Sequence, residues 1–190
     1  MRHLHTQRLL DHWRNTRGEQ LAPRKTSLKP HEIKDHLAFA FLLKREGEDT
    51  FTFSLAGTGL CDLFGHELKG QSFVHLWADQ SRNAGRTSLI RVCNLSVPTV
   101  AVAVGETADL RPMSAEIVLL PYADERNETT WILGHFQPLE PLSRLLGRKL
   151  VRLRMTANAI LTGDVHGPNE VAFVDDKRKA PQHLKVVASR

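Results

Sequence analysis

The chain has 190 residues and a mass of 21.4 kDa, the size of one domain with extensions rather than of two domains. With 41% hydrophobic and 25% charged residues, its composition is globular and excludes a disordered polymer. No apolar run in the sequence approaches the roughly 20 residues that cross a bilayer, and the first residues lack the apolar stretch of a secretion signal, so we expect a cytoplasmic protein.

The net charge of +5 is distributed unevenly along the chain. Residues 1–45 carry +6, residues 46–140 carry −7 and residues 141–190 carry +6. An acidic middle between basic flanks could attract one segment to another within a dimer, or could present the flanks to nucleic acid, acidic protein or anionic lipid. The charge pattern alone does not decide among these partners.

Two short helices and then a β-hairpin are predicted in the first part of the chain. Leu9 and Trp13 are four residues apart and so share a helical face, and Pro30 suits the first turn of a second helix. From there the apolar period changes from helical spacing to every second residue, over 39–43 and again over 51–55. The polar residues between these two runs predict the turn of the hairpin.

Helices followed by three strands are predicted in the second part. Helical spacing returns over 60–64 and 79–97, and period-2 runs follow at 100–104, 113–119 and 131–135. Strands and helices do not alternate, so parallel pairing is not favoured. We therefore expect an α+β fold, a five-stranded antiparallel sheet with helices over one face, plus an N-terminal helix and a basic C-terminal extension.

The segment that joins the second strand to the long helix carries a specific pattern. Residues 63–70 read Leu-Phe-Gly-His-Glu-Leu-Lys-Gly, within the longer run Ala56–Phe73. This resembles the helical crossing of a PAS domain, where the chain leaves the second strand, passes small helices and enters a longer helix before the last three strands. Together with Leu76-Trp77 and the stretch 132–140, it resembles the stand-alone bacterial PAS family described largely from alphaproteobacteria. The resemblance covers residues 8–155.

We expect the chain to have four parts. Residues 1–22 form an N-terminal helix that is expected to mediate dimerisation, and residues 23–140 form the PAS core. Residues 141–162 form a basic extension, either a strand or a helix, and residues 163–190 are predicted to be a disordered tail.

PAS domains use the space between sheet and helices as a pocket, so the resemblance implies a small, mostly apolar ligand. The alternative is that the same side chains simply fill a core. His135 is the expected polar contact, on the face shared by Trp131 and Leu133. The residues expected to line the space are Phe53, Leu60, Phe64, Phe73, Trp77, Ile90, Ile117 and Leu133.

The cofactor is unknown from the sequence. Flavin photochemistry in light-sensing PAS domains needs a cysteine after a Gly-x-Asn turn, and aligning Gly70 with that turn places Phe73 at the cysteine's position. A flavin adduct is therefore disfavoured. Haem-binding members use a histidine on the long helix, and residues 80–97 contain none, so His75 nearby keeps haem only as a minor alternative.

The remaining histidines do not predict a metal site. His3 and His5 are two residues apart and His31 and His36 five apart, and neither pair is joined by a carboxylate or cysteine at metal-ligand spacing. We interpret them as surface histidines.

Two further groups are candidate interaction surfaces. The stripe of Leu9, Leu10 and Trp13 is too short to be stable alone, so a homodimer is predicted in which this helix packs beside its symmetry mate or across the open sheet face. The bases between residues 144 and 154 are interpreted first as a solvated face and second as an anion-binding patch. These bases are Arg144, Arg148, Lys149, Arg152 and Arg154.

Catalytic signatures such as Gly-x-Ser-x-Gly, His-Glu-x-x-His and a Walker loop are absent from the sequence. We therefore expect a non-enzymatic PAS sensor or interaction module in bacterial signalling, which binds a small ligand, a protein partner or both. The alternative is a basic-flanked nucleic-acid or membrane-surface binding protein on the same fold. A cone-fold enzyme is a third hypothesis, for which the inward faces supply only His135.

Overall fold

The computed structural model describes residues 3–162 and 170–173. Its strands form one antiparallel sheet in the order β2-β1-β5-β4-β3-β6-β7. The strands are β1 (Ala40–Arg45), β2 (Phe51–Ala56), β3 (Thr99–Thr107), β4 (Pro112–Ala123), β5 (Thr129–Pro138), β6 (Leu150–Thr162) and β7 (Glu170–Phe173). The α-helices are α1 (Leu4–Arg17), α2 (Thr58–Phe64) and α3 (Asp79–Leu95), and the 3-10 helices are η1 (Lys25–Ser27), η2 (Pro30–Phe39), η3 (Phe73–Leu76) and η4 (Leu142–Leu145). None of these helices is long and apolar enough to span a membrane.

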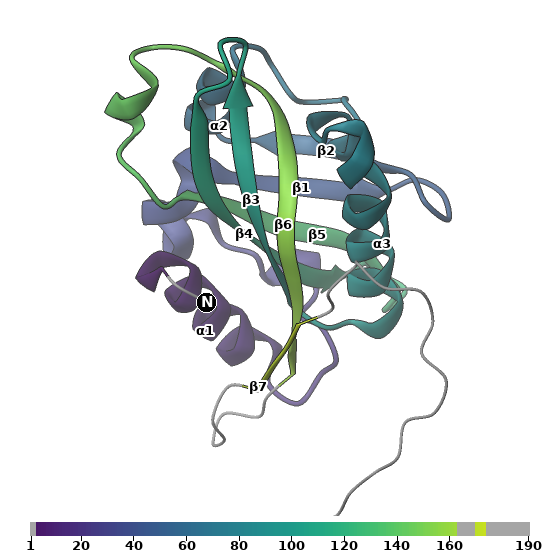
Figure 1. The fold of residues 1–190 in the computed structure, drawn as a ribbon. Helices are drawn as coiled ribbons and strands as arrows, with labels where there is room; N and C mark the ends of the chain where they lie inside the picture. The colour runs from purple at the N-terminus through teal and green to yellow at the C-terminus, as the bar shows by residue number, and fades with distance from the viewer. Residues whose placement is uncertain (1–2, 163–169, 174–190) are drawn as a thin grey trace, which may run out of the picture.

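Helices cover both faces of the sheet. The sheet is strongly twisted, so that β3, β4 and β6 cross the direction of β1 and β2, and α1 and α3 lie on opposite sides of it (Figure 1). One apolar cluster joins α2, η3 and α3 to one face, and a second joins α1 and η2 to the other. The α+β class is therefore confirmed: the middle helices lie over one face, and the separately predicted N-terminal helix covers the other face together with η2.

The predicted hairpin and the three later strands are confirmed, and the sheet has two strands beyond the expected five. The basic extension begins with the short η4 and is a strand from Leu150 on, because β6 pairs with β3 from Leu150 to Ile160. Of the predicted tail, the structure describes only Glu170–Phe173, which pairs with β6. The remainder, 163–169 and 174–190, lies outside the described residues, so the disorder prediction is not tested there.

Two glycines let aromatic rings lie close to the backbone. A Cβ on Gly134 of β5 would collide with the ring of Phe41, its partner in the neighbouring strand β1. A Cβ on Gly85 of α3 would lie 3.0 Å from Nε1 of Trp77, closer than ordinary contact. Both rings can therefore fill the layer between the sheet and the helices.

Candidate functional site

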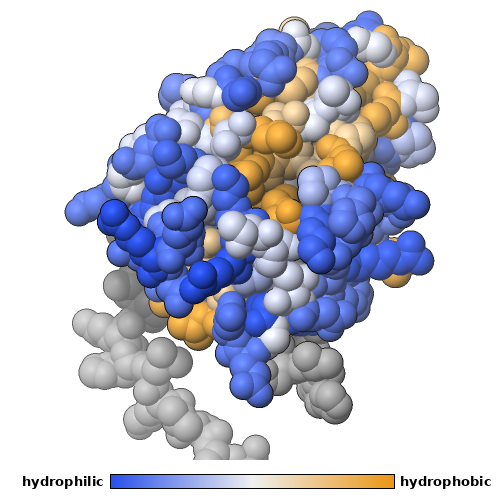
Figure 2. Space-filling view, turned by 180° about the vertical axis from the view of Figure 1, so that it is seen from behind, coloured by the Kyte–Doolittle hydropathy of each residue, from blue (hydrophilic) through white to orange (hydrophobic). Residues whose placement is uncertain are grey.

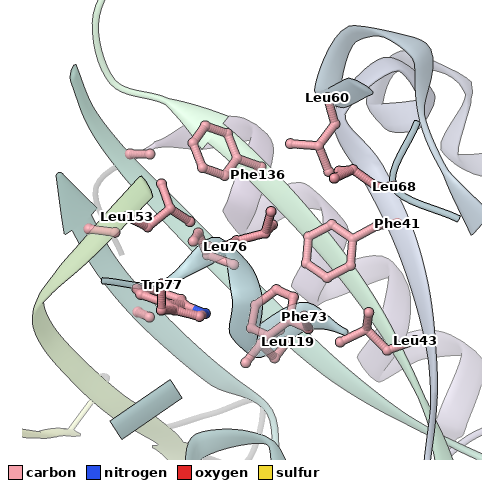
Figure 3. Packing of buried hydrophobic residues seen from close by; sticks show 14 of the residues in the cluster. Phe41, Leu43, Leu60, Leu68, Phe73, Leu76, Trp77, Leu119, Phe136 and Leu153 are labelled. Atoms are coloured by element: carbon pink, nitrogen blue, oxygen red, sulfur yellow. The ribbon is translucent and has the colours of Figure 1, made fainter. Parts of the chain in front are cut away.

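Most of the residues predicted to line a ligand pocket lie together between the sheet and the helices. They belong to one buried cluster, and Ile90 packs half-buried against it. Figure 3 shows this layer, with Phe41, Phe73, Trp77 and Leu119 pointing toward one another. The pocket residues found in this cluster are Phe53, Leu60, Phe64, Phe73, Trp77 and Ile117.

Aromatic rings fill the middle of this layer. Phe73 lies 5.5 Å from Phe41, 5.8 Å from Phe53 and 5.9 Å from Trp77, measured between ring centroids. Such separations are those of rings in direct contact. An apolar ligand could enter here only if these rings moved, and its binding stays a prediction.

Leu133 and His135 do not face this layer, and their assignment to it is wrong. On β5, Ile132 and Phe136 face α3, whereas Leu133 belongs to the second apolar cluster, under α1. Side chains alternate along a strand, so His135 lies on the same side as Leu133. The polar contact expected for an interior ligand is therefore on the opposite face of the sheet.

His135 ends a row of four histidine side chains that the sequence did not reveal. Its ring centroid lies 5.0 Å from that of His36, which lies 5.6 Å from His5, which in turn lies 5.1 Å from His3. We call these four residues the histidine row. His135 and His36 are only 2% and 8% exposed, so the interpretation of His36 as a surface histidine is wrong. The row brings together α1, η2 and β5, which are joined only by tertiary folding.

The two buried members of the row are held in the neutral form at neutral pH. Burial, and after it the neighbouring His36, His5 and His3, lower the pKa of His135 to about 3. Burial also lowers the pKa of His36, followed by the charge of His5. Among the described residues, no hydrogen-bond partner is found for Nδ1 of His36 or of His135, nor for Oγ1 of the fully buried Thr6.

The row does not have the geometry of a metal centre. No group of three or more histidine, cysteine, aspartate and glutamate side chains within residues 3–162 is arranged to hold a metal ion. The row instead places two buried nitrogen atoms, Nδ1 of His36 and of His135, beneath the N-terminal half of α1, without hydrogen-bond partners among the described residues.

The apolar stripe of α1 is buried within its own chain. Leu9 and Leu10 are fully buried and Trp13 is 2% exposed, in the cluster that includes Leu120 and Leu133 of the sheet. Nε1 of Trp13 donates a hydrogen bond to the Pro121 carbonyl oxygen at 2.8 Å. Of the two arrangements predicted for this helix, the structure has the one across the sheet face. These side chains are therefore not an exposed dimer surface, and dimerisation stays a prediction.

The five bases between residues 144 and 154 are each paired within the chain. Arg152 and Arg154 contact Glu106 of the neighbouring strand β3 at 2.9 and 3.5 Å. Hydrogen bonding from Arg152 is the main cause that lowers the pKa of Glu106. The other pairs are Arg148 with Asp109, Arg144 with Glu140, and Lys149 with the Asp62 carbonyl oxygen. An anion-binding patch in this segment is therefore not supported.

A comparison with protein families identifies this arrangement. A family model described as PAS domain matches residues 1–137. The chain belongs to the PAS domain family. This confirms the PAS domain inferred from the motif at residues 63–70 and agrees with the antiparallel sheet and its helices, whereas the stand-alone bacterial family stays a prediction. The search of curated proteins found no match.

A comparison with solved structures also found similar chains. The LOV protein of Rhodobacter sphaeroides is 12% identical, with a TM-score of 0.46 over 62% of this chain and 72% of that one. The dark structure of the Aureochrome1 LOV domain is 12% identical, with a TM-score of 0.45 over 60% and 84%. VqmA of Vibrio cholerae is 12% identical, with a TM-score of 0.44 over 63% and 56%.

The two cofactor predictions for this PAS domain rest on residues that differ in burial. Phe73, at the position of the flavin-reactive cysteine, is 2% exposed and lies within the aromatic layer. His75, the residue considered for haem, is exposed to solvent rather than buried in that layer. Both cofactor statements stay predictions.

Proposed function

We propose that this PAS protein is a non-enzymatic sensor or interaction module in bacterial signalling, located in the cytoplasm, whose output is contact with another protein. The observation that carries the proposal is the packing of α1 on the sheet. This helix covers a face that would otherwise be open. Its C-terminal half packs there through apolar side chains, whereas its N-terminal half covers buried polar atoms that lack hydrogen-bond partners among the described residues. The proposed event is the release of α1.

The apolar and the polar contacts of α1 contribute to its docking with opposite signs. Burial of Leu9, Leu10 and Trp13 stabilises docking, by about 1.5–3 kcal/mol for each apolar side chain. Each buried polar atom without a partner costs about 1–3 kcal/mol, and Thr6, His36 and His135 each have one among the described residues. Because these contributions oppose each other, the polar atoms weaken the docking of α1, and a ligand or partner with a preference for one state can shift it.

Release of α1 would uncover an apolar surface for a partner. Val118, Leu120 and Leu133 of β4 and β5 would lose their cover. Figure 2 shows, on the side turned away in Figure 1, a band of apolar surface with hydrophilic margins, which adds contact area for a protein partner. We propose a second copy of this chain as the first partner, which gives a homodimer, and an unidentified signalling protein as the next.

The input of the proposed module is a small ligand. The sheet–helix layer is retained as the place for an apolar metabolite, with Phe53, Phe73 and Trp77 as the rings that would have to move. The alternatives are supported less well. Nucleic acid or anionic lipid would need free bases where residues 144–154 are paired, and an enzyme would need an acid–base pair, whereas His135 is a buried neutral side chain.

Hydrogen exchange of α1, measured by mass spectrometry, tests the proposal. The amides of residues 4–17 are expected to exchange faster than those of β4 and β5, because α1 opens without global unfolding. Trp13→Ala should increase exchange in α1 and raise the mass measured by light scattering, whereas Gln7→Ala, on the exposed side of α1, should change neither. If α1 exchanges only as fast as the central strands, in the wild type and in Trp13→Ala, α1 is a fixed part of the core and the proposal fails.

A further inference from the structure

A cleft of about 420 Å³ lies at the end of β4, on the edge of the face that α1 covers. One wall is Arg24–Thr26, the other is Ala123–Arg126, and Trp131 of β5 lies between them. The volume is within the range of small-molecule sites, about 300–1,000 Å³. None of these residues belongs to the sheet–helix layer or to the histidine row.

Backbone contacts hold the two walls in place. The Ala123 amide donates to the Pro23 carbonyl oxygen at 2.8 Å, and Arg24 forms a parallel bridge with Ala123. The Asp124 carboxylate accepts the backbone N–H groups of Arg126 and Glu128 at 2.9 and 3.0 Å. Asp124 is therefore occupied in fixing the turn between β4 and β5, and the cleft is preformed.

Three cations converge on this cleft. The ammonium of Lys25 lies 3.7 Å from the centroid of the Trp131 ring, a cation–π contact that orients the side chain. The side chains of Arg24 and Arg126, one on each wall, have no hydrogen bond or ion pair with the part of the chain that the structure describes. The walls also carry the two carboxylates of Asp124 and Glu125, and the charge of Arg126 helps to lower the pKa of Asp124. The three cations therefore leave the lining with a net positive charge of +1.

The contrast with residues 144–154 shows why this cleft is the better anion site. There, acids from β3 and the following loop neutralise the arginines. A smaller cleft of about 260 Å³ also adjoins Ala123, and among its described lining residues none is charged. The cleft at Trp131 combines an oriented ammonium, an aromatic wall and two guanidinium groups that form no ion pair within the described part of the chain.

We propose that this cleft binds a small aromatic anion, with its carboxylate or phosphate on Lys25 and the two arginines and its ring against Trp131 and Ala123. Guanidinium and ammonium groups both donate to such oxyanions, and the arginine forks add directionality. A bare inorganic anion would leave the indole unused, and an extended polyanion would not enter a concave site of this size. This inference goes beyond the proposed function and does not require α1 to move.

Isothermal titration calorimetry with 1-naphthoate and 1-naphthyl phosphate tests the inference. At least one should bind, more weakly as salt rises. Neutral 1-naphthamide and inorganic phosphate should each bind at least about tenfold more weakly, since each lacks one of the two contacts. Binding of naphthoate alone identifies a carboxylate site, and binding of naphthyl phosphate alone identifies a phosphate site. Failure of both probes, or equal binding of the amide, overturns the proposal.

Two variants and a matched control locate the binding. Lys25→Gln should weaken binding about tenfold, the loss of one charge-assisted hydrogen bond, and Arg24→Gln combined with Arg126→Gln should weaken it further. Lys69→Gln removes an exposed base elsewhere on the chain and should leave binding unchanged. Unchanged affinity in both cleft variants would overturn the assignment. Because hydrogen exchange of α1 is measured separately, the failure of one proposal is distinguishable from the failure of the other.

Discussion

Acidification should destabilise the folded protein through His135. The pKa of this imidazole is lowered to about 3 in the folded chain, against an ordinary value of 6.5. The unfolded state therefore binds more protons than the folded state between these two pH values, and the free energy of unfolding falls as pH decreases through this window. The stability conferred by neutral His135 is fully present above pH 6.5.

The loss of stability at pH 5 is set by the protonation of His135 in the unfolded state. A pH of 5 is 1.5 units below the ordinary pKa of 6.5 that His135 has in the unfolded chain. At about 1.36 kcal/mol per unit, the free energy of unfolding is therefore lower by about 2 kcal/mol than at neutral pH. This result holds for any folded-state pKa well below 5, because the folded imidazole then stays neutral at pH 5. Burial of His36 lowers its pKa too and adds to the loss in the same direction.

Urea unfolding at pH 7.5 and pH 5.0 measures the effect. His135→Gln removes the titrating group, so the variant should lose about 2 kcal/mol less than the wild type between the two pH values. His75→Gln, at an exposed position, should lose as much as the wild type. Identical losses in wild type and His135→Gln would refute the reasoning. Should His135→Gln not fold, the imidazole proton resonance of wild-type His135 must still show no titration down to pH 5.

Three substitutions test the packing on both sides of the sheet. Gly134→Ala should destabilise by about 1–3 kcal/mol or more, because the new methyl group collides with the ring of Phe41, and thermal unfolding measures this. Trp13→Phe leaves the Pro121 carbonyl without its donor and should cost about 1–3 kcal/mol in urea unfolding; an unchanged midpoint would contradict the role of that hydrogen bond. Leu119→Trp should cost about 1–3 kcal/mol if the sheet–helix layer is filled, whereas little loss would show room for a ligand.

The sequence determined the order of the elements and the family. Period-2 runs separated by polar turns identified the hairpin and the last three strands, since alternation is a local property of the chain. The glycines of residues 63–70 were equally informative: Gly65 and Gly70 both adopt positive φ, at 78° and 80°, which glycine tolerates better than other residues. These signals need no knowledge of distant contacts, and together they sufficed for the PAS assignment.

Only the tertiary structure decided which way β5 faces and which charges are free. Alternation reveals the buried face of a strand when the other face meets water, but α1 and α3 cover both faces of β5, so Leu133 and Phe136 are equally apolar and equally buried. The pairing of charges also depends on contacts between residues that are distant in the sequence. Arg152 is neutralised by Glu106, 46 residues earlier in the chain, whereas Arg24 and Arg126 line one cleft and form no ion pair with the residues that the structure describes. Both outcomes depend on tertiary contacts, which bring together residues that the sequence keeps far apart.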